Sequence, residues 1–241
     1  MDKAIYGLLV LILFVPLVSN GIAGESNAWG EARMNLVEET IVGRGVTDAA
    51  VVDAMRRVPR HLFVPEDVVR HAYEDRPIPI GHGQTISQPY IVALMTELVQ
   101  PQPDFRVLEI GAGSGYQAAV LAELVDHVYT VEIVPPLATW AEERLQLAGY
   151  TNVTVRQADG FYGWAEHAPF DAIVVTAAAP HIPPPLLDQL REGGRMIIPV
   201  GSRFRVQQLV LVEKKNGAFL TRNILPVRFV PFTRSDPASG W

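Results

Sequence analysis

The spacing of apolar positions changes along the chain and separates two kinds of segment. From residue 105 onward, short apolar runs typical of buried strands alternate with segments of helical period. This alternation predicts an α/β fold with a doubly wound, mostly parallel sheet. The expected strands are 105–110, 127–132, 153–157, 170–176 and 195–200, and the expected helices are 116–124, 136–147 and 185–190.

The last two apolar segments predict a different kind of pairing. Residues 207–214 and 219–227 are separated by Asn216-Gly217, a dipeptide that favours the tight turn of a β-hairpin. We therefore expect an antiparallel strand pair to close the sheet at its C-terminal end.

Residues 34–100 predict helices and one long loop. Helical periods cover 34–44, 49–58 and 89–99, with Thr47 or Asp48 as the N-cap of the second helix and a short helix reaching residue 72. The Pro- and Gly-rich stretch 73–90 reads as a loop, and long loops of this kind are often functional. We expect one domain, 34–241, in which the N-terminal helices and loop (34–100) extend the core (101–241).

The first residues differ from the rest. Lys3 precedes an apolar run of about 15 residues from Ala4 to Val18, and the small residues of Gly21–Gly24 follow it, as in a secretory signal peptide. We expect residues 1–24 to be such a signal and 25–33 to be a polar linker, so that the product is exported and meets a membrane only through this segment. Translation from Met34 would instead give a cytoplasmic chain.

Composition excludes several classes of chemistry. The net charge of −6 disfavours nucleic acid as a partner, because phosphate binding requires a basic surface. The absence of cysteine excludes disulfides, thiolate metal sites and a cysteine nucleophile. The six histidines are scattered without metal-ligand spacing, so we expect no metal site.

The most informative motif follows the first strand of the core. Glycines at 111, 113 and 115 allow a tight turn and a close approach of the backbone to a ligand. Glu132 lies 21 positions after Gly111, at the end of the second strand, where an acid can bind ribose hydroxyls. Asp159-Gly160 comes directly after the third strand, where Asp159 can accept from an adenine amino group.

The glycine spacing separates this site from a dinucleotide site. The dinucleotide fingerprint is G-x-G-x-x-G, whereas this chain has G-x-G-x-G followed by Tyr116. Glu109, two residues before the first glycine, would repel a pyrophosphate and suit a ligand that carries an ammonium and a sulfonium. The pattern is the E-x-G-x-G-x-G signature of class I S-adenosylmethionine methyltransferases. The expected cofactor residues are Glu109, Gly111, Gly113, Ser114, Glu132, Asp159 and Gly160, with S-adenosylmethionine as co-substrate.

Several longer stretches resemble the protein-L-isoaspartate O-methyltransferase family, from about Met34 to Arg234. They are Val58–Pro65, Gly83–Pro89, Glu109–Tyr116, Asp171–Ala178 and Val227–Pro231. The resemblance implies that Ser87 is the active-site residue, that Thr85 and Gln88 flank it in a loop over the methyl donor, and that Val230 and Pro231 support the substrate backbone. It also implies that the partners are damaged proteins and peptides with L-isoaspartyl residues, methylated at the free α-carboxylate, and we expect a monomer.

The chemistry is consistent with this implied role. A carboxylate is already ionised at neutral pH, so no general base is needed, and Ser87 can aim it by donating a hydrogen bond. Ser87 is outside a G-x-S-x-G context, which disfavours a hydrolase. The alternatives are a methyltransferase for another carboxylate or small molecule, and a non-catalytic S-adenosylmethionine-binding protein.

Overall fold

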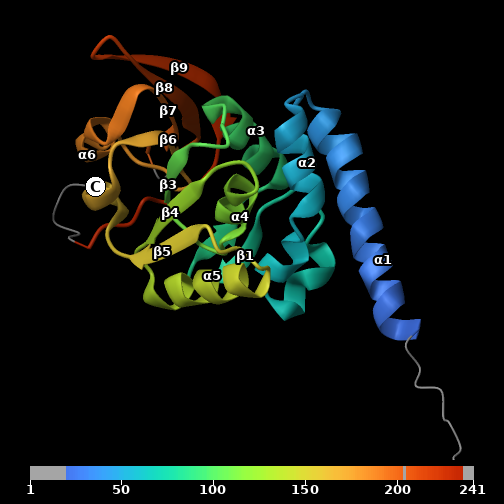
Figure 1. Cartoon of the computed structure of the whole chain (residues 1–241). Coiled ribbons are helices and arrows are strands. Elements are labelled where there is room, and N and C mark those ends of the chain that lie inside the picture. Colours follow the sequence, from blue (N-terminus) through green and yellow to red (C-terminus); the bar gives the residue numbers. More distant parts are fainter. Residues whose placement is uncertain (1–19, 203–204, 236–241) are drawn as a thin grey trace, which may run out of the picture.

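The computed structural model describes residues 20–202 and 205–235 of the 241-residue chain, and Figure 1 shows the arrangement of its elements. A seven-stranded sheet with the order β5-β4-β3-β6-β7-β8-β9 forms its centre. The strands are β3 (Arg106–Ile110), β4 (His127–Glu132), β5 (Val153–Gln157), β6 (Phe170–Val175), β7 (Leu190–Val200), β8 (Gln207–Lys215) and β9 (Ala218–Val227).

Five strands of this sheet are parallel, and the last two are antiparallel. The parallel strands are β5, β4, β3, β6 and β7, and β8 pairs with β7 and β9 in antiparallel registers. Asn216 and Gly217 connect β8 to β9 with φ of 54° and 72°, which is the backbone of a tight hairpin turn. The predicted doubly wound sheet and its closing strand pair are therefore confirmed.

Helices cover both faces of the sheet. On one face, α2 (Ala49–Arg57), α3 (Pro89–Val99), α4 (Tyr116–Ala122) and α5 (Pro135–Leu147) contribute to a core that includes Val107 and Val128. On the other face, α6 (Pro184–Asp188) packs over a second core that includes Leu108 and Ile110. Adjacent residues of β3 point to opposite faces, so a strand buried on both sides is apolar at nearly every position.

The N-terminal part contains more regular structure than the sequence predicts. Helix α1 (Asn20–Asn35) continues into a π-helix (Leu36–Val42), so residues 25–33, which the sequence analysis treats as a polar linker, are helical. Trp29 and Arg33 of α1 contact His61 and Tyr73, and these long-range contacts explain why a polar, weakly patterned segment is helical. Figure 1 shows α1 beside α2 at one side of the molecule.

Two further differences concern the region before α3. Asp48, and not Thr47, caps α2, since its carboxylate accepts from the backbone N–H of Ala50 and Val51. The expected loop 73–90 contains a small hairpin of β1 (Ile78–Gly81) and β2 (Gln84–Ile86). Short 3₁₀ helices occupy Arg60–Phe63, Glu66–His71, Gly160–Tyr162 and Ala165–His167.

The signal-like segment falls mostly outside the described residues. The apolar run from Ala4 to Val18 is not among them, while residues 20–24 belong to α1. Within 20–202 and 205–235, no helix has the length and apolar character to cross a membrane.

Candidate functional site

One cavity lies at the carboxyl ends of β3, β4 and β6. It encloses about 730 Å³ including its open mouth, and its walls come from the glycine turn after β3, the segment 84–87, and the C-terminal segment 230–233. β3 is the strand at which the chain order reverses, because β4 and β5 lie on one side of it and β6 and β7 on the other. Ligands of open α/β sheets bind at this position.

The glycine turn forms the floor of the cavity. Gly111 has a φ of +94°, and a Cβ on this residue would lie 2.4 Å from Oγ1 of Thr176. Both the backbone conformation and the close neighbour therefore require glycine. Gly113 and Ser114, two more of the residues expected to bind the cofactor, also line the cavity.

Glu132 is held at the cavity by backbone groups. Its carboxylate accepts from the N–H of Gly113 at 2.8 Å and from that of Val134 at 2.9 Å, and the residue is buried. Each carboxylate oxygen can accept a second hydrogen bond. Glu132 thus presents two oriented acceptors to the cavity, which fits the paired hydroxyls of a ribose.

Glu109 lies behind the glycine turn and does not line the cavity. It is fully buried, and the hydroxyl of Thr130 on β4 donates to its Oε2. Burial, with a further contribution from Glu132, raises the pKa of Glu109 to about 8, although the Thr130 hydrogen bond opposes this. The sequence argument placed a negative charge here that acts directly on the ligand. The structure corrects it, because Glu109 is a buried acid that favours its proton.

Asp159 is engaged by the C-terminal segment instead of facing the cavity. Its carboxylate forms an ion pair with Arg234 at 3.0 Å and accepts from the backbone and hydroxyl of Ser235. Burial alone would raise the pKa of Asp159, but hydrogen bonds from Ser235, Arg234 and Phe161 outweigh it and lower the pKa. The Asp159 carboxylate, which the sequence analysis expects to accept from an adenine amino group, therefore already has hydrogen-bond partners within the protein.

Gly160, the neighbour of Asp159, does line the cavity. A Cβ at this position would lie 2.4 Å from Cγ2 of Ile110 and 3.6 Å from Cζ of Phe232. Phe232 and Thr233 directly precede Arg234, so the Asp159–Arg234 ion pair holds these two residues against this wall of the cavity.

A second cavity adjoins the first and shares four residues with it. It encloses about 990 Å³ including its open mouth, between the segment 85–91 and the end of β9. The residues that line both cavities are Thr85, Ser87, Thr176 and Val230.

Ser87 therefore lies where the two cavities meet. Gln88 lines only the second cavity, and its side-chain amide donates to Oδ2 of Asp75 at 2.7 Å. Pro231 lines only the first. The residues that the resemblance implies for substrate binding are thus divided between the two cavities: Gln88 lines only the second, Pro231 only the first, and Thr85 and Val230 line both.

Sequence reasoning did not single out Thr176 or Arg44 as site residues. Thr176 follows β6 and donates its hydroxyl to the carbonyl of Gly111 at 2.7 Å. A polar residue directly after an apolar strand next to the glycine turn was the available signal. Arg44 carried no such signal, because it reaches the second cavity from a distant part of the chain.

The described residues contain no cluster of three or more His, Asp or Glu side chains that could hold a metal ion. The cavity fits S-adenosylmethionine, because Glu132 offers acceptors for a ribose and Gly113 leaves the backbone open to a close ligand. The sheet order, the glycine turn and Glu132 define a class I S-adenosylmethionine-dependent methyltransferase.

Comparisons with known proteins identify the family within this class. The model of the protein-L-isoaspartate(D-aspartate) O-methyltransferase family matches residues 31–236. A protein-L-isoaspartate O-methyltransferase of Opitutus terrae is 55% identical over 235 residues, which cover 98% of this chain and 100% of the relative. One of Polaromonas sp. is 61% identical over 201 residues, covering 82% of this chain and 95% of the relative.

Solved structures give the same result. A protein-L-isoaspartate O-methyltransferase has a TM-score of 0.76 and 32% identity, covering 83% of this chain and 65% of its own. A Plasmodium falciparum chain, described as a beta-aspartate methyltransferase in complex with S-adenosyl-L-homocysteine, has a TM-score of 0.72 and 28% identity, covering 83% and 98%. The chain belongs to the protein-L-isoaspartate(D-aspartate) O-methyltransferase family.

Proposed function

We propose that this chain methylates the free α-carboxylate of L-isoaspartyl residues in damaged proteins, with S-adenosylmethionine as methyl donor and Ser87 at the reacting carboxylate. Family membership supports the reaction. The observation that carries the role of Ser87 is its position in the walls of both cavities. The first cavity takes the donor and the second takes the substrate chain.

The residues of the site perform positioning and shielding. When bound, S-adenosylmethionine supplies a methyl group activated by a sulfonium. The substrate carboxylate is ionised at neutral pH, so the protein removes no proton from it. The Ser87 hydroxyl donates a hydrogen bond to one carboxylate oxygen and thereby aims the other at the methyl carbon. Glu132 fixes the ribose, and Thr85 and Val230 exclude water from the junction.

The geometry also accounts for discrimination against normal aspartate. In an isoaspartyl residue the chain continues through the side-chain carbonyl, which leaves the α-carboxylate free on a short branch. In a normal aspartyl residue the chain continues through the α-carbonyl, and the free carboxylate is one methylene further from the backbone. With the backbone held in the second cavity, only the isoaspartyl carboxylate reaches Ser87.

Transfer of labelled methyl to a peptide pair that differs only in L-isoaspartate versus aspartate tests the proposal. We expect transfer to the isoaspartyl peptide alone. Equal labelling of both peptides would refute the repair function, and Ser87→Ala with unchanged turnover would refute the role of Ser87.

We further propose that the enzyme acts as a monomer, because the described residues of one chain line both cavities. Light scattering at assay concentrations tests this, and a stable dimer as the active species would contradict it.

We also propose that the full-length product is exported, on the grounds of Lys3, the apolar run and the small residues at Gly21–Gly24. Cytoplasmic retention is the alternative, through a start at Met34, but that start removes Trp29 and Arg33, which contact the folded domain. The mature N-terminus, read by mass spectrometry from separated cell fractions, tests the proposal. A chain that begins at Met34 and occurs only in cytosol would overturn it.

A further inference from the structure

Among the described residues, the two charged side chains that line the second cavity are both basic. They are Arg44 and Arg228, and no Asp or Glu is among the described residues of its wall. This contrasts with the net charge of −6 for the chain as a whole. An acidic protein with a locally basic groove attracts anionic groups to that groove.

The two arginines are in different situations. Arg44 forms an ion pair with Asp75 at 2.9 Å, and its guanidinium stacks 3.5 Å from the ring centroid of Tyr90. Its charge is therefore largely used within the protein. Arg228 follows β9, is exposed, and forms no ion pair within the described part of the chain. Its guanidinium is available to a bound chain.

The position of Arg228 relates it to the substrate and not to the methyl donor. Arg228 lines only the second cavity, while Val230, two residues later, lines both. A chain that lies in the second cavity with its isoaspartyl residue at Ser87 places a neighbouring side chain near Arg228. The groove is otherwise apolar or uncharged along this wall, with Leu225, Pro226 and Phe229.

We propose that Arg228 is a specificity-determining residue, which makes the enzyme prefer isoaspartyl sites that have an acidic side chain close by in the sequence. The inference rests on the proposed function, since it assigns the second cavity to the substrate chain. The preference is moderate, because an exposed ion pair contributes about two- to fivefold to an equilibrium. It weakens as salt screens the charges.

The test measures kcat/KM for isoaspartyl peptides that differ at one neighbouring position, which is Glu, Gln or Lys. The substitution is moved through the positions on both sides of the isoaspartate. At one position or more we expect the wild type to favour Glu over Gln by about two- to fivefold at low salt. In Arg228→Gln the ratio of kcat/KM for the Glu peptide to that for the Gln peptide should fall to about one. Arg228→Glu should favour the Lys peptide over the Gln peptide. Ratios within one variant cancel any loss of total activity.

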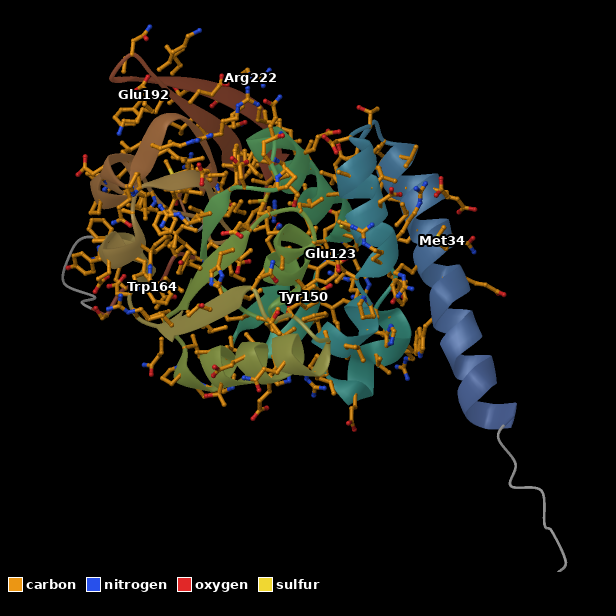
Figure 2. The ribbon with its side chains drawn as sticks, viewed as in Figure 1. Met34, Glu123, Tyr150, Trp164, Glu192 and Arg222 are labelled. Carbon is orange, nitrogen blue, oxygen red and sulfur yellow. The ribbon has the colours of Figure 1, made fainter. Side chains whose placement is uncertain are left out.

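Arg222→Glu is the matched control. Arg222 lies on β9, is exposed and is not part of the second cavity, and Figure 2 labels it on that strand. The substitution changes the net charge by the same amount as Arg228→Glu, so it should leave the Glu-to-Gln ratio as in the wild type.

The outcomes separate the two proposals. A wild type without any charge preference, or a preference that Arg222→Glu changes as much as Arg228→Glu, overturns the inference and leaves the proposed function intact. Failure to methylate every isoaspartyl peptide overturns the proposed function and the inference with it.

Discussion

Asp75 accepts a hydrogen bond from the side-chain amide of Gln88, with 2.7 Å between its Oδ2 and Nε2 of Gln88. The other carboxylate oxygen accepts from the backbone N–H of Tyr90 at 2.9 Å, and Arg44 pairs with the same carboxylate. Three contacts thus connect Asp75 to the segment that carries Ser87 and to the wall of the second cavity. Asp75 does not line either cavity, so it acts by positioning.

Asp75→Ala should therefore lower kcat while leaving the affinity for S-adenosylmethionine nearly unchanged. Loss of two hydrogen bonds at a charged acceptor frees the Ser87 segment, and we expect a decrease of roughly tenfold in kcat for about 1.4 kcal/mol of lost alignment. Steady-state kinetics and calorimetry measure the two quantities. Asp67→Ala, at an exposed carboxylate outside both cavities, is the control. Equal losses of kcat and cofactor affinity in Asp75→Ala would contradict a positioning role.

Glu132 and Ser87 should divide binding and catalysis between them. Glu132→Ala removes the acceptors expected to hold the ribose and should weaken S-adenosylmethionine binding by roughly 1–3 kcal/mol. Ser87→Ala should lower turnover with that binding nearly intact, because Ser87 contacts the substrate carboxylate. Calorimetric titration of both variants measures the division, and matching losses of cofactor affinity would refute it.

Glu109 should make the folded state less stable as the pH rises. Its folded pKa of about 8 lies above the ordinary value of 4.5, so between these pH values the unfolded state has released a proton that the folded state keeps. The free energy of unfolding contributed by this group is therefore highest below pH 4.5 and falls as the pH approaches 8. Glu109→Gln should unfold in urea with a weaker dependence on pH across this interval. Identical pH dependence in the wild type and the variant would show that Glu109 is not the buried acid described.

Helix α1 should stabilise the folded domain through Trp29. The Trp29 and His61 rings stack with centroids 5.3 Å apart and an interplanar angle of 12°, and Arg33 donates to the hydroxyl of Tyr73. Trp29→Ala should lower the free energy of unfolding by about 1–2 kcal/mol. A chain that starts at Met34 should lose more, because Arg33 goes as well. Figure 2 labels Met34 near the C-terminal end of α1.

Gly30→Ala is the control on the same helix. A Cβ there has no neighbour within 4 Å, and alanine favours a helix over glycine by about 0.5–1 kcal/mol. This variant should be as stable as the wild type or more so. If Trp29→Ala unfolds at the same urea concentration as Gly30→Ala, α1 does not stabilise the domain.

Local patterns were sufficient for most of the elements of the sheet. Short apolar runs predicted the strands, and Asn216-Gly217 predicted the turn between β8 and β9. These predictions succeed because the cause and the effect are close together in the chain. A strand end, a turn dihedral and the direction of a parallel strand depend on a few consecutive residues.

The small hairpin of β1 and β2 and the helix at 20–35 were not predicted. Neither has a strong local period, and α1 contacts residues about 30 to 40 positions away, such as Tyr73 with Arg33. Helix and strand formation here depends on packing against the domain, which overrides weak local preference.

The sequence by itself determined which residues carry chemistry, and the tertiary structure decided which of them face the cavities. Glu109 pairs with Thr130, and Glu132 follows Thr130 by two residues, so both acids lie on the same side of the sheet. Only Glu132, the last residue of β4, lines the cavity, whereas Glu109 is fully buried behind the glycine turn. Asp159 meets Arg234, 75 residues later, and Arg44 and Arg228 line one groove from opposite parts of the chain. Such pairings have no local signal, because they arise only when the packed sheet brings distant segments together.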